Sequence, residues 1–256
     1  MKQYNNEKYI VSFTSFGKRV PMIGKTIYAL TKQTYNDFHL VLTLYKDDVK
    51  YIDEVIQLLL DNNLLELIVA DNDLGPHLKY YYAMQKYYDK PIITVDDDRY
   101  YRTTTVQSLV EKYETLDYKS IISNCAIKMQ RKGSRLLPYP AWVPFRLAPN
   151  EKSMLAMAEG FAGILYPPCC FANLQTDEFI NGILECKYDD DLYLKVQAIK
   201  NKIPVTQANV KLSYAEADNI TEMMEYNLHN NQNKGNTNRI NMCYKFEKDL
   251  LEGFML

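Results

Sequence analysis

The sequence lacks several features that mark common classes of protein. No apolar run approaches the roughly 20 residues of a membrane-spanning helix, and no signal-like apolar stretch precedes the first charged residues. The formal net charge is only −2 at pH 7, so the charge balance gives no reason to expect a nucleic-acid partner. We therefore expect a cytoplasmic protein, with at most peripheral contact at the inner face of a membrane.

Cysteine and glycine are also sparse. The five cysteines form no CxxC pair, and Cys169 and Cys170 are adjacent, which is poor spacing for a mutual disulfide. No P-loop, G-x-G-x-x-G or G-x-S-x-G motif is present, and no Cys/His pattern of a catalytic pair is visible. The cysteines therefore indicate a reducing compartment and not a disulfide-stapled fold.

The first half of the 256 residues alternates between strand and helix patterns. Strands are predicted at 9–14, 38–45, 67–70 and 92–95, and helices at 22–34, 49–59 and 78–88, the second helix capped by Asp47-Asp48. This order predicts an α/β fold with a mostly parallel sheet flanked by helices. In such sheets ligands bind at the carboxyl ends of the strands.

The second half is less regular. A helix is predicted at 103–116, a strand at 120–123 and a helix at 192–199. Residues 128–149 contain the single tryptophan among Arg, Lys and Pro, which favours a long functional loop. Residues 229–238 are polar and Asn-rich, and we expect them to be mobile.

Two acidic triads are the main candidates for chemistry. Asp96-Asp97-Asp98 follows the apolar run IITV, and clustered carboxylates at a strand end suit a hard divalent cation such as Mn²⁺ or Mg²⁺. Asp96 and Asp98 share a side if strand geometry persists; a solvated acidic turn is the alternative. Asp189-Asp190-Asp191 precedes a helix, where acidic residues are favoured as caps, although one of them could act as a general base.

Basic and polar residues near strand ends are further candidates. Lys79 lies one turn into a helix after Gly75-Pro76, where it is either an exposed lysine or a phosphate contact. The segment after the first strand is either a plain turn or a nucleoside pocket with an aromatic floor; its candidate residues are Thr14, Ser15, Phe16, Lys18 and Arg19. His77 and His229 have no obvious partner in the sequence.

The order of these segments resembles that of GT-A glycosyltransferases, near the family 2 group and its bacterial capsule- and lipopolysaccharide-type members. The similar segments are VSFTSFGKRVPMIGKTIYALTKQTYNDFHLVL, LGPHLKYYYAMQKYYDKPIITVDDDRYY and ECKYDDDLYLKVQAI, within about residues 8–200. The resemblance implies a single GT-A (Rossmann-like) domain over 1–256, with a nucleotide-sugar-binding half (1–118) and a less regular acceptor-binding half (119–256). It also implies an inverting hexosyl transfer from a UDP-sugar to a glycan or lipid-linked acceptor, in polysaccharide biosynthesis.

The resemblance assigns roles to individual residues. Asp96 and Asp98 match the DxD pair that holds Mn²⁺ or Mg²⁺, with His229 a further candidate ligand. Asp191 matches the general base, with Asp190 its neighbour and alternative; Glu159 is another possible base. The donor would be bound by Thr14, Ser15, Phe16, Arg19, Lys79 and Asp97.

Two other classes compete with this interpretation. A haloacid-dehalogenase-type phosphatase also needs a strand followed by DxD, and would use Ser123 and Lys128, but its DxD strand usually comes first in the chain. A non-enzymatic Ca²⁺-binding module could use the aspartates, but the triad lacks the glycine and spacing of a Ca²⁺ loop.

Overall fold

The computed structural model describes residues 7–116, 119–210, 217–220, 223 and 237–256. Its centre is an eight-stranded sheet with the strand order β10-β13-β6-β12-β4-β1-β2-β3. The strands are β1 (Tyr9–Thr14), β2 (Phe38–Tyr45), β3 (Glu66–Ala70), β4 (Ile92–Thr94), β6 (Ile121–Ser123), β10 (Lys152–Ser153), β12 (Ile164–Tyr166) and β13 (Val205–Gln207). Strands β4, β1, β2 and β3 are parallel, and β12 runs antiparallel between β4 and β6.

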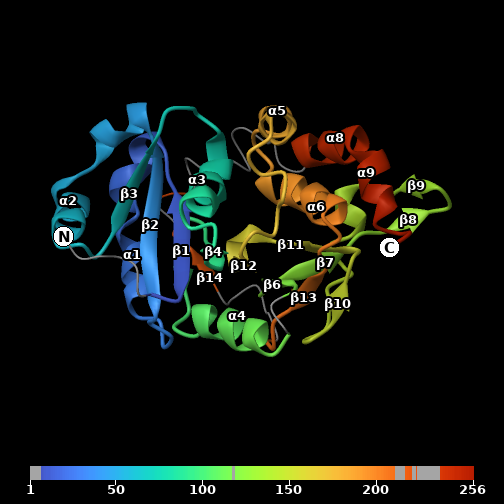
Figure 1. Ribbon diagram of the computed structural model, residues 1–256, viewed down its shortest axis with the longest axis horizontal. Helices are drawn as coiled ribbons and strands as arrows, with labels where there is room; N and C mark the ends of the chain where they lie inside the picture. Colours follow the sequence, from blue (N-terminus) through green and yellow to red (C-terminus); the bar gives the residue numbers. More distant parts are fainter. Residues whose placement is uncertain (1–6, 117–118, 211–216, 221–222, 224–236) are drawn as a thin grey trace.

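Helices cover both faces of this sheet (Figure 1). They are α1 (Gly24–Thr31), α2 (Glu54–Asp61), α3 (Leu78–Lys86), α4 (Thr105–Glu114), α5 (Asp177–Glu185), α6 (Asp190–Lys200), α8 (Thr237–Lys245) and α9 (Glu247–Glu252). Short 3₁₀ turns are η1 (Gly17–Met22), η2 (Lys46–Tyr51), η3 (Gly75–His77), η4 (Tyr139–Ala141) and η5 (Gly160–Ala162). The expected α/β architecture is thus confirmed. No helix in the described parts of the chain is long and apolar enough to cross a membrane.

Three two-stranded ribbons accompany the central sheet in the described residues, and one of them joins the two halves of the chain. They pair β5 (Arg99–Tyr101) with β14 (Ala217–Asn219), β7 (Ala126–Lys128) with β11 (Ala156–Ala158), and β8 (Arg131–Lys132) with β9 (Arg135–Leu136). Strand β5 begins directly after Asp98. Its pairing with β14 therefore holds the chain where it leaves the loop that carries Asp96–Asp98.

The alternation of side chains along β1 divides the core into two layers. Val11 and Phe13 pack in one cluster with residues of α1 and α4. Ile10 packs in a second cluster with residues of α3, α5 and α6. This two-sided burial explains why β1 is an almost continuous apolar run, as expected for a parallel strand covered on both faces.

The structure corrects two expectations. Asp47 and Asp48 lie in η2, and the cap of α2 is Asp53, whose carboxylate accepts a 2.9 Å hydrogen bond from the Ile56 N–H. Residues 128–149, predicted as a long functional loop, contain the strands β8 and β9 and the turn η4, and the fully buried Trp142 packs there in a third cluster with residues of α6, α8 and α9. The predicted mobile segment 229–238 lies mostly outside the described residues.

Candidate functional site

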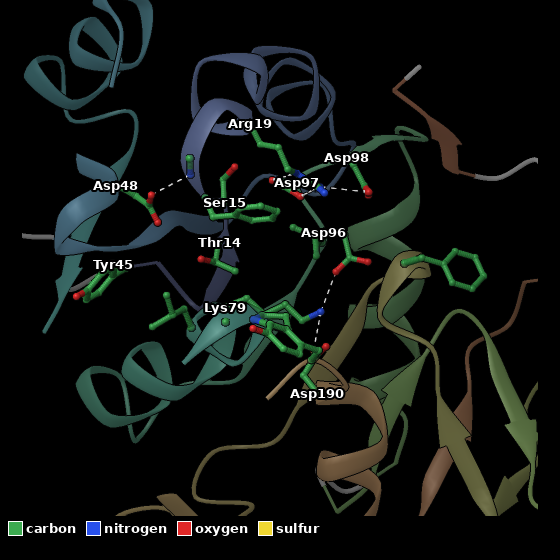
Figure 2. Close-up of a pocket in the computed structure, with 18 of the residues that line it drawn as sticks. Thr14, Ser15, Arg19, Tyr45, Asp48, Lys79, Asp96, Asp97, Asp98 and Asp190 are labelled. Atoms are coloured by element: carbon green, nitrogen blue, oxygen red, sulfur yellow. Dashed lines mark hydrogen bonds and ion pairs between the residues drawn. The ribbon is translucent and has the colours of Figure 1, made fainter. Parts of the chain in front are cut away.

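A pocket of about 690 Å³ opens where the carboxyl ends of β1, β2 and β4 meet the starts of α3 and α6. Residues of both halves of the chain line it, including Asp96–Asp98 of the first acidic triad and Asp190 and Asp191 of the second. The close-up in Figure 2 shows Thr14 at the end of β1 and Ser15 after it, Tyr45 at the end of β2, the triad after β4, and Lys79 between Asp96 and Asp190. The parallel topology thus brings together strand ends that are far apart in sequence.

Asp97 is held by Arg19. The Arg19 Nε donates to Asp97 Oδ2 at 3.1 Å, its Nη2 donates to Asp97 Oδ1, and Nη2 also lies 3.2 Å from Asp98 Oδ2. Arg19 is buried, so the pairing is shielded from solvent. Burial raises the pKa of Asp97, and the Arg19 charge opposes that rise. The paired Asp97 and Arg19 side chains therefore form part of the pocket floor.

Lys79 connects the two triads. Its Nζ donates to Asp96 Oδ1 at 2.8 Å and lies 2.7 Å from Asp190 Oδ2. Only 4% of the residue is exposed, so the alternative of an exposed surface lysine is wrong. Burial lowers the pKa of Lys79, but Asp190 and Asp96 outweigh it and hold that pKa well above its usual range. Lys79 is therefore a buried cation shared by carboxylates from both halves.

The three residues of the second triad lie in different positions and make different contacts. Asp189 is the N-cap of α6, accepting from the Leu192 N–H at 3.3 Å, so the capping alternative holds for this residue. Asp190 and Asp191 lie in the first turn and line the pocket. Both oxygens of Asp191 accept from the Gly160 N–H, at 3.1 and 3.0 Å.

The environments of Asp190 and Asp191 separate their pKa values. Burial raises the pKa of Asp190, but the Lys79 charge dominates and lowers it. Burial and the neighbouring charge of Asp190 raise the pKa of Asp191 well above its usual range. Burial likewise raises the pKa of Glu159, which also lines the pocket. A carboxylate with a raised pKa is the better proton acceptor near neutral pH, which favours Asp191 over Asp190.

The other end of the pocket is aromatic and polar. Phe16 and Tyr51 line it beside Asp48, whose carboxylate accepts from the Gly17 N–H at 2.9 Å. The Thr14 hydroxyl donates to the Thr43 carbonyl at 2.7 Å. Such a mixture suits a flat heterocycle with a sugar attached.

Sequence reasoning missed Arg239 and Tyr139, which both line the pocket. Arg239 comes from α8 and contacts Asp189, Asp191 and Glu159. Nothing in the local sequence marks either residue, because neither belongs to a motif. Their role depends on how the C-terminal helices pack.

Other candidates lie elsewhere. His77 is buried and satisfied, with Nδ1 2.7 Å from the Tyr80 hydroxyl and Nε2 3.1 Å from the Cys186 carbonyl. His229 lies outside the described residues. Ser123 and Lys128, which the phosphatase alternative requires, are absent from the described residues that line the pocket.

No protein-family model matches the sequence, and no curated protein matches it either. Solved structures of the S. aureus glycosyltransferase TarS, residues 1–349, are similar in fold. The complex with UDP gives a TM-score of 0.53 at 15% identity, covering 80% of this chain and 58% of that chain. The complex with UDP-GlcNAc gives a TM-score of 0.51 at 15% identity, covering 80% and 56%.

This chain thus spans less than two thirds of the TarS fragment. At such low identity the similarity establishes a shared fold: a mixed α/β architecture around a large, mostly parallel sheet, as in the glycosyltransferase neighbours. The GT-A-like fold expected from the sequence is therefore supported, while the capsule or lipopolysaccharide subgroup stays a prediction.

Proposed function

We propose that this protein is a metal-dependent glycosyltransferase that moves a sugar from a UDP-sugar to a hydroxyl group of a glycan or lipid-linked acceptor, with inversion. The observation that carries the proposal is the convergence of two acidic clusters on one pocket, Asp96–Asp98 after β4 and Asp190–Asp191 at the start of α6, with Lys79 between them. The complexes of TarS with UDP and with UDP-GlcNAc support the class of donor.

The nucleoside would occupy the aromatic end of the pocket. Phe16, Tyr45 and Tyr51 line this end, and Asp48 lies beside them. Aromatic rings can stack on a base, and the polar groups of Thr14 and Ser15 lie beside the same cavity. The diphosphate would then point toward Asp96 and Asp98.

The acidic residues fit a divalent ion that is shared with the donor. In the described residues no group of three or more His, Cys, Asp or Glu could hold a metal ion by itself. Mg²⁺ is usually bound by one or two carboxylates together with substrate phosphates, so a full protein cage is not needed. Asp96, whose side chain is 29% exposed, and Asp98 would be its ligands. When bound there, Mn²⁺ or Mg²⁺ would offset the charge that develops on the departing diphosphate.

Carboxylates outnumber cations around the pocket, which supports this assignment. Nine carboxylates line it, against five cationic side chains; the carboxylates are Asp47, Asp48, Asp73, Asp96, Asp97, Asp98, Glu159, Asp190 and Asp191, and the cations are Arg19, Lys50, Lys79, Arg99 and Arg239. A doubly charged diphosphate would be repelled by such a surplus unless a cation accompanies it.

Asp191 would act as the general base. Its carboxylate would take the proton of the acceptor hydroxyl as that oxygen bonds to the anomeric carbon of the donor sugar. The bond between that carbon and the phosphate oxygen breaks at the same time, and the nucleoside diphosphate leaves with the electron pair. Attack from the side opposite the leaving group inverts the anomeric centre. Phe161 and Tyr139 would flank the acceptor, since they line this end of the pocket.

Calorimetric titration of UDP tests the donor and metal assignments together. We expect tight binding in Mn²⁺ and weak binding in excess chelator, because an ion held by Asp96 and Asp98 would offset the charge of the diphosphate. The D96N/D98N variant should bind UDP weakly under both conditions, whereas D71N, a control at an exposed aspartate after β3, should behave as the wild type. Equal UDP affinity with and without chelator would overturn the shared metal site, and no UDP binding under either condition would overturn the proposed function.

A further inference from the structure

Arg239 reaches the site from α8 and contacts three acidic residues at once. Its Nε donates to Asp189 Oδ2 at 2.7 Å, and its Nη2 donates to Asp189 Oδ1 at 2.8 Å. The remaining contacts are longer: Nη2 lies 3.5 Å from Asp191 Oδ2, and Nη1 lies 3.6 Å from Glu159 Oε2. The guanidinium is therefore anchored on Asp189 and held at a distance from Asp191 and Glu159.

A contact with Tyr139 orients the guanidinium, and Tyr139 is itself held by Glu159. Its Cζ lies 4.6 Å from the centroid of the Tyr139 ring, so the cation stacks on an aromatic face. The Tyr139 hydroxyl in turn donates to the Glu159 carboxylate at 3.2 Å. Asp189 is also the N-cap of α6. Its pairing with Arg239 therefore helps to orient the first turn of α6, which carries Asp190 and Asp191.

The difference between the short contacts of Arg239 with Asp189 and its longer contact with Asp191 matters if Asp191 is a general base. A tight bidentate pair with arginine would occupy the oxygens of Asp191 and weaken them as proton acceptors. Here the Gly160 N–H orients Asp191, while the arginine supplies charge from 3.5 Å. An oxygen of Asp191 can then still accept a proton from a hydroxyl group.

Charge around Asp191 explains why a cation is needed there. Burial and the charges of Asp190 and Glu159 favour the protonated form of Asp191, and Lys79 and Arg239 oppose them. Lys79 is already shared between Asp96 and Asp190. The titratable or charged groups that face Asp191 are Asp190, Lys79, Arg239, Glu159, Tyr139, Tyr166 and Cys125.

We propose that Arg239 is a positioning residue that favours the ionised form of Asp191 and leaves its carboxylate accessible, by anchoring on Asp189 and facing Asp191 and Glu159 from a distance. The inference rests on the proposed function only in taking Asp191 as the base. The electrostatic part stands on the contacts alone and can be measured without substrate.

The test follows the titration of Asp191 by carbon-13 NMR in protein labelled at the aspartate carboxyl carbon, with D191N used to assign the signal. We expect R239Q to move the titration of Asp191 upward by about one pH unit or more, because an opposite charge within a few ångströms is lost. R239K should give a smaller upward shift, since lysine keeps the charge but cannot hold Asp189 in a two-pronged contact.

Lys200→Gln is the matched control. Lys200 also links α6 to other helices, to α5 through Glu178 at 3.1 Å and to α9 through Asp249 at 3.8 Å, but it lies outside the pocket. K200Q should leave the titration of Asp191 unchanged. A titration that R239Q leaves at the wild-type pH, with only the melting temperature lowered, would overturn the proposal. If R239Q does not fold, the titration of Asp191 is measured in R239K instead, and an unshifted titration there would overturn the proposal.

UDP binding separates this inference from the proposed function. R239Q should bind UDP with Mn²⁺ as tightly as the wild type, because Arg239 lies on the side of the pocket away from the aromatic end. If neither protein binds UDP, the proposed function fails while the shifted titration still supports the role of Arg239. If only R239Q loses UDP binding, Arg239 acts on the donor and the proposal is wrong.

Discussion

Asp191 has the surroundings of a proton acceptor that is held in place by the backbone. The Gly160 N–H orients both of its oxygens, and its raised pKa separates it from Asp190, which is paired with Lys79. The sequence named both residues as bases, and the contacts favour Asp191.

We expect D191N to lose transfer by about 10²–10⁴-fold while keeping UDP affinity, because an amide cannot take the proton of the acceptor. The measurement compares sugar transfer and UDP binding in D191N and D190N. Near-normal turnover in D191N would remove Asp191 as the base and make Glu159 the next candidate.

Gly160 offers a second probe of the same carboxylate. A Cβ at this position would lie 2.8 Å from Asp191 Oδ1 and 3.0 Å from Lys79 Nζ, and the backbone φ is not positive. G160A should therefore fold but displace Asp191, with a loss of transfer on the order of 10²-fold. G24A is the control, because a Cβ there meets nothing within 4 Å; equal activity in both variants would show that the position of Asp191 does not matter.

Lys79 should contribute to stability as well as to the site. K79M leaves the buried Asp190 and the partly exposed Asp96 without their cation, which we expect to cost about 3–5 kcal/mol of unfolding free energy. K79M/D190N should recover part of that loss, because one unpaired charge is gone. Urea unfolding measures both, with K132M at an exposed position of β8 as the control. A fully stable K79M would show that this ion pair is dispensable.

At the scale of elements, the start of β3 is tied to its neighbours by one buried carboxylate. Glu66 contacts His39 of β2 at 2.8 Å, and it accepts from Lys86 and from the Tyr87 hydroxyl, both at 2.6 Å. Burial acts to raise the pKa of Glu66, but these partners outweigh it and lower that pKa to about 2. The ionised form is thus favoured in the folded protein, and it links the edge strand to α3.

A lowered pKa gives stability that is present above the unfolded value near 4.5 and is lost as the pH falls toward 2. We expect E66Q to be less stable than the wild type by about 1–2 kcal/mol at pH 7, the contact with exposed Lys86 being partly screened. Urea unfolding at a series of pH values should show this difference shrink below pH 4.5 and vanish near pH 2. A difference that does not change with pH would mean that shape, and not charge, links these elements.

At the scale of the whole molecule, the two halves share a core. The cluster around Ile10 and Val41 also contains Ile121, Phe179 and Tyr193 from the second half. The pocket is likewise lined by carboxylates of each half, Asp96–Asp98 from the first and Asp190 and Asp191 from the second. Shared burial of this kind favours a single cooperative unit, in keeping with the predicted single domain over 1–256.

The single tryptophan gives a direct test of that unity. Trp142 is fully buried in the second half, and its Nε1 donates to the Leu137 carbonyl at 2.8 Å, so its fluorescence reports on that half. Far-UV circular dichroism reports on all helices and strands. We expect the two signals to give coincident urea transitions. A separate tryptophan transition would indicate two units and contradict the single-domain prediction.

The β-α order and the position of Asp96–Asp98 after β4 could be predicted from the sequence, because both follow from local patterns. Periodic burial gives strands and helices, and a buried strand followed by carboxylates gives an acidic strand end. Three other features became visible in the folded protein alone: Lys79 is buried between the two triads, residues 128–149 pack around Trp142, and Arg239 faces Asp191. These contacts join residues far apart in the chain, so they depend on how whole elements pack, which no local pattern encodes.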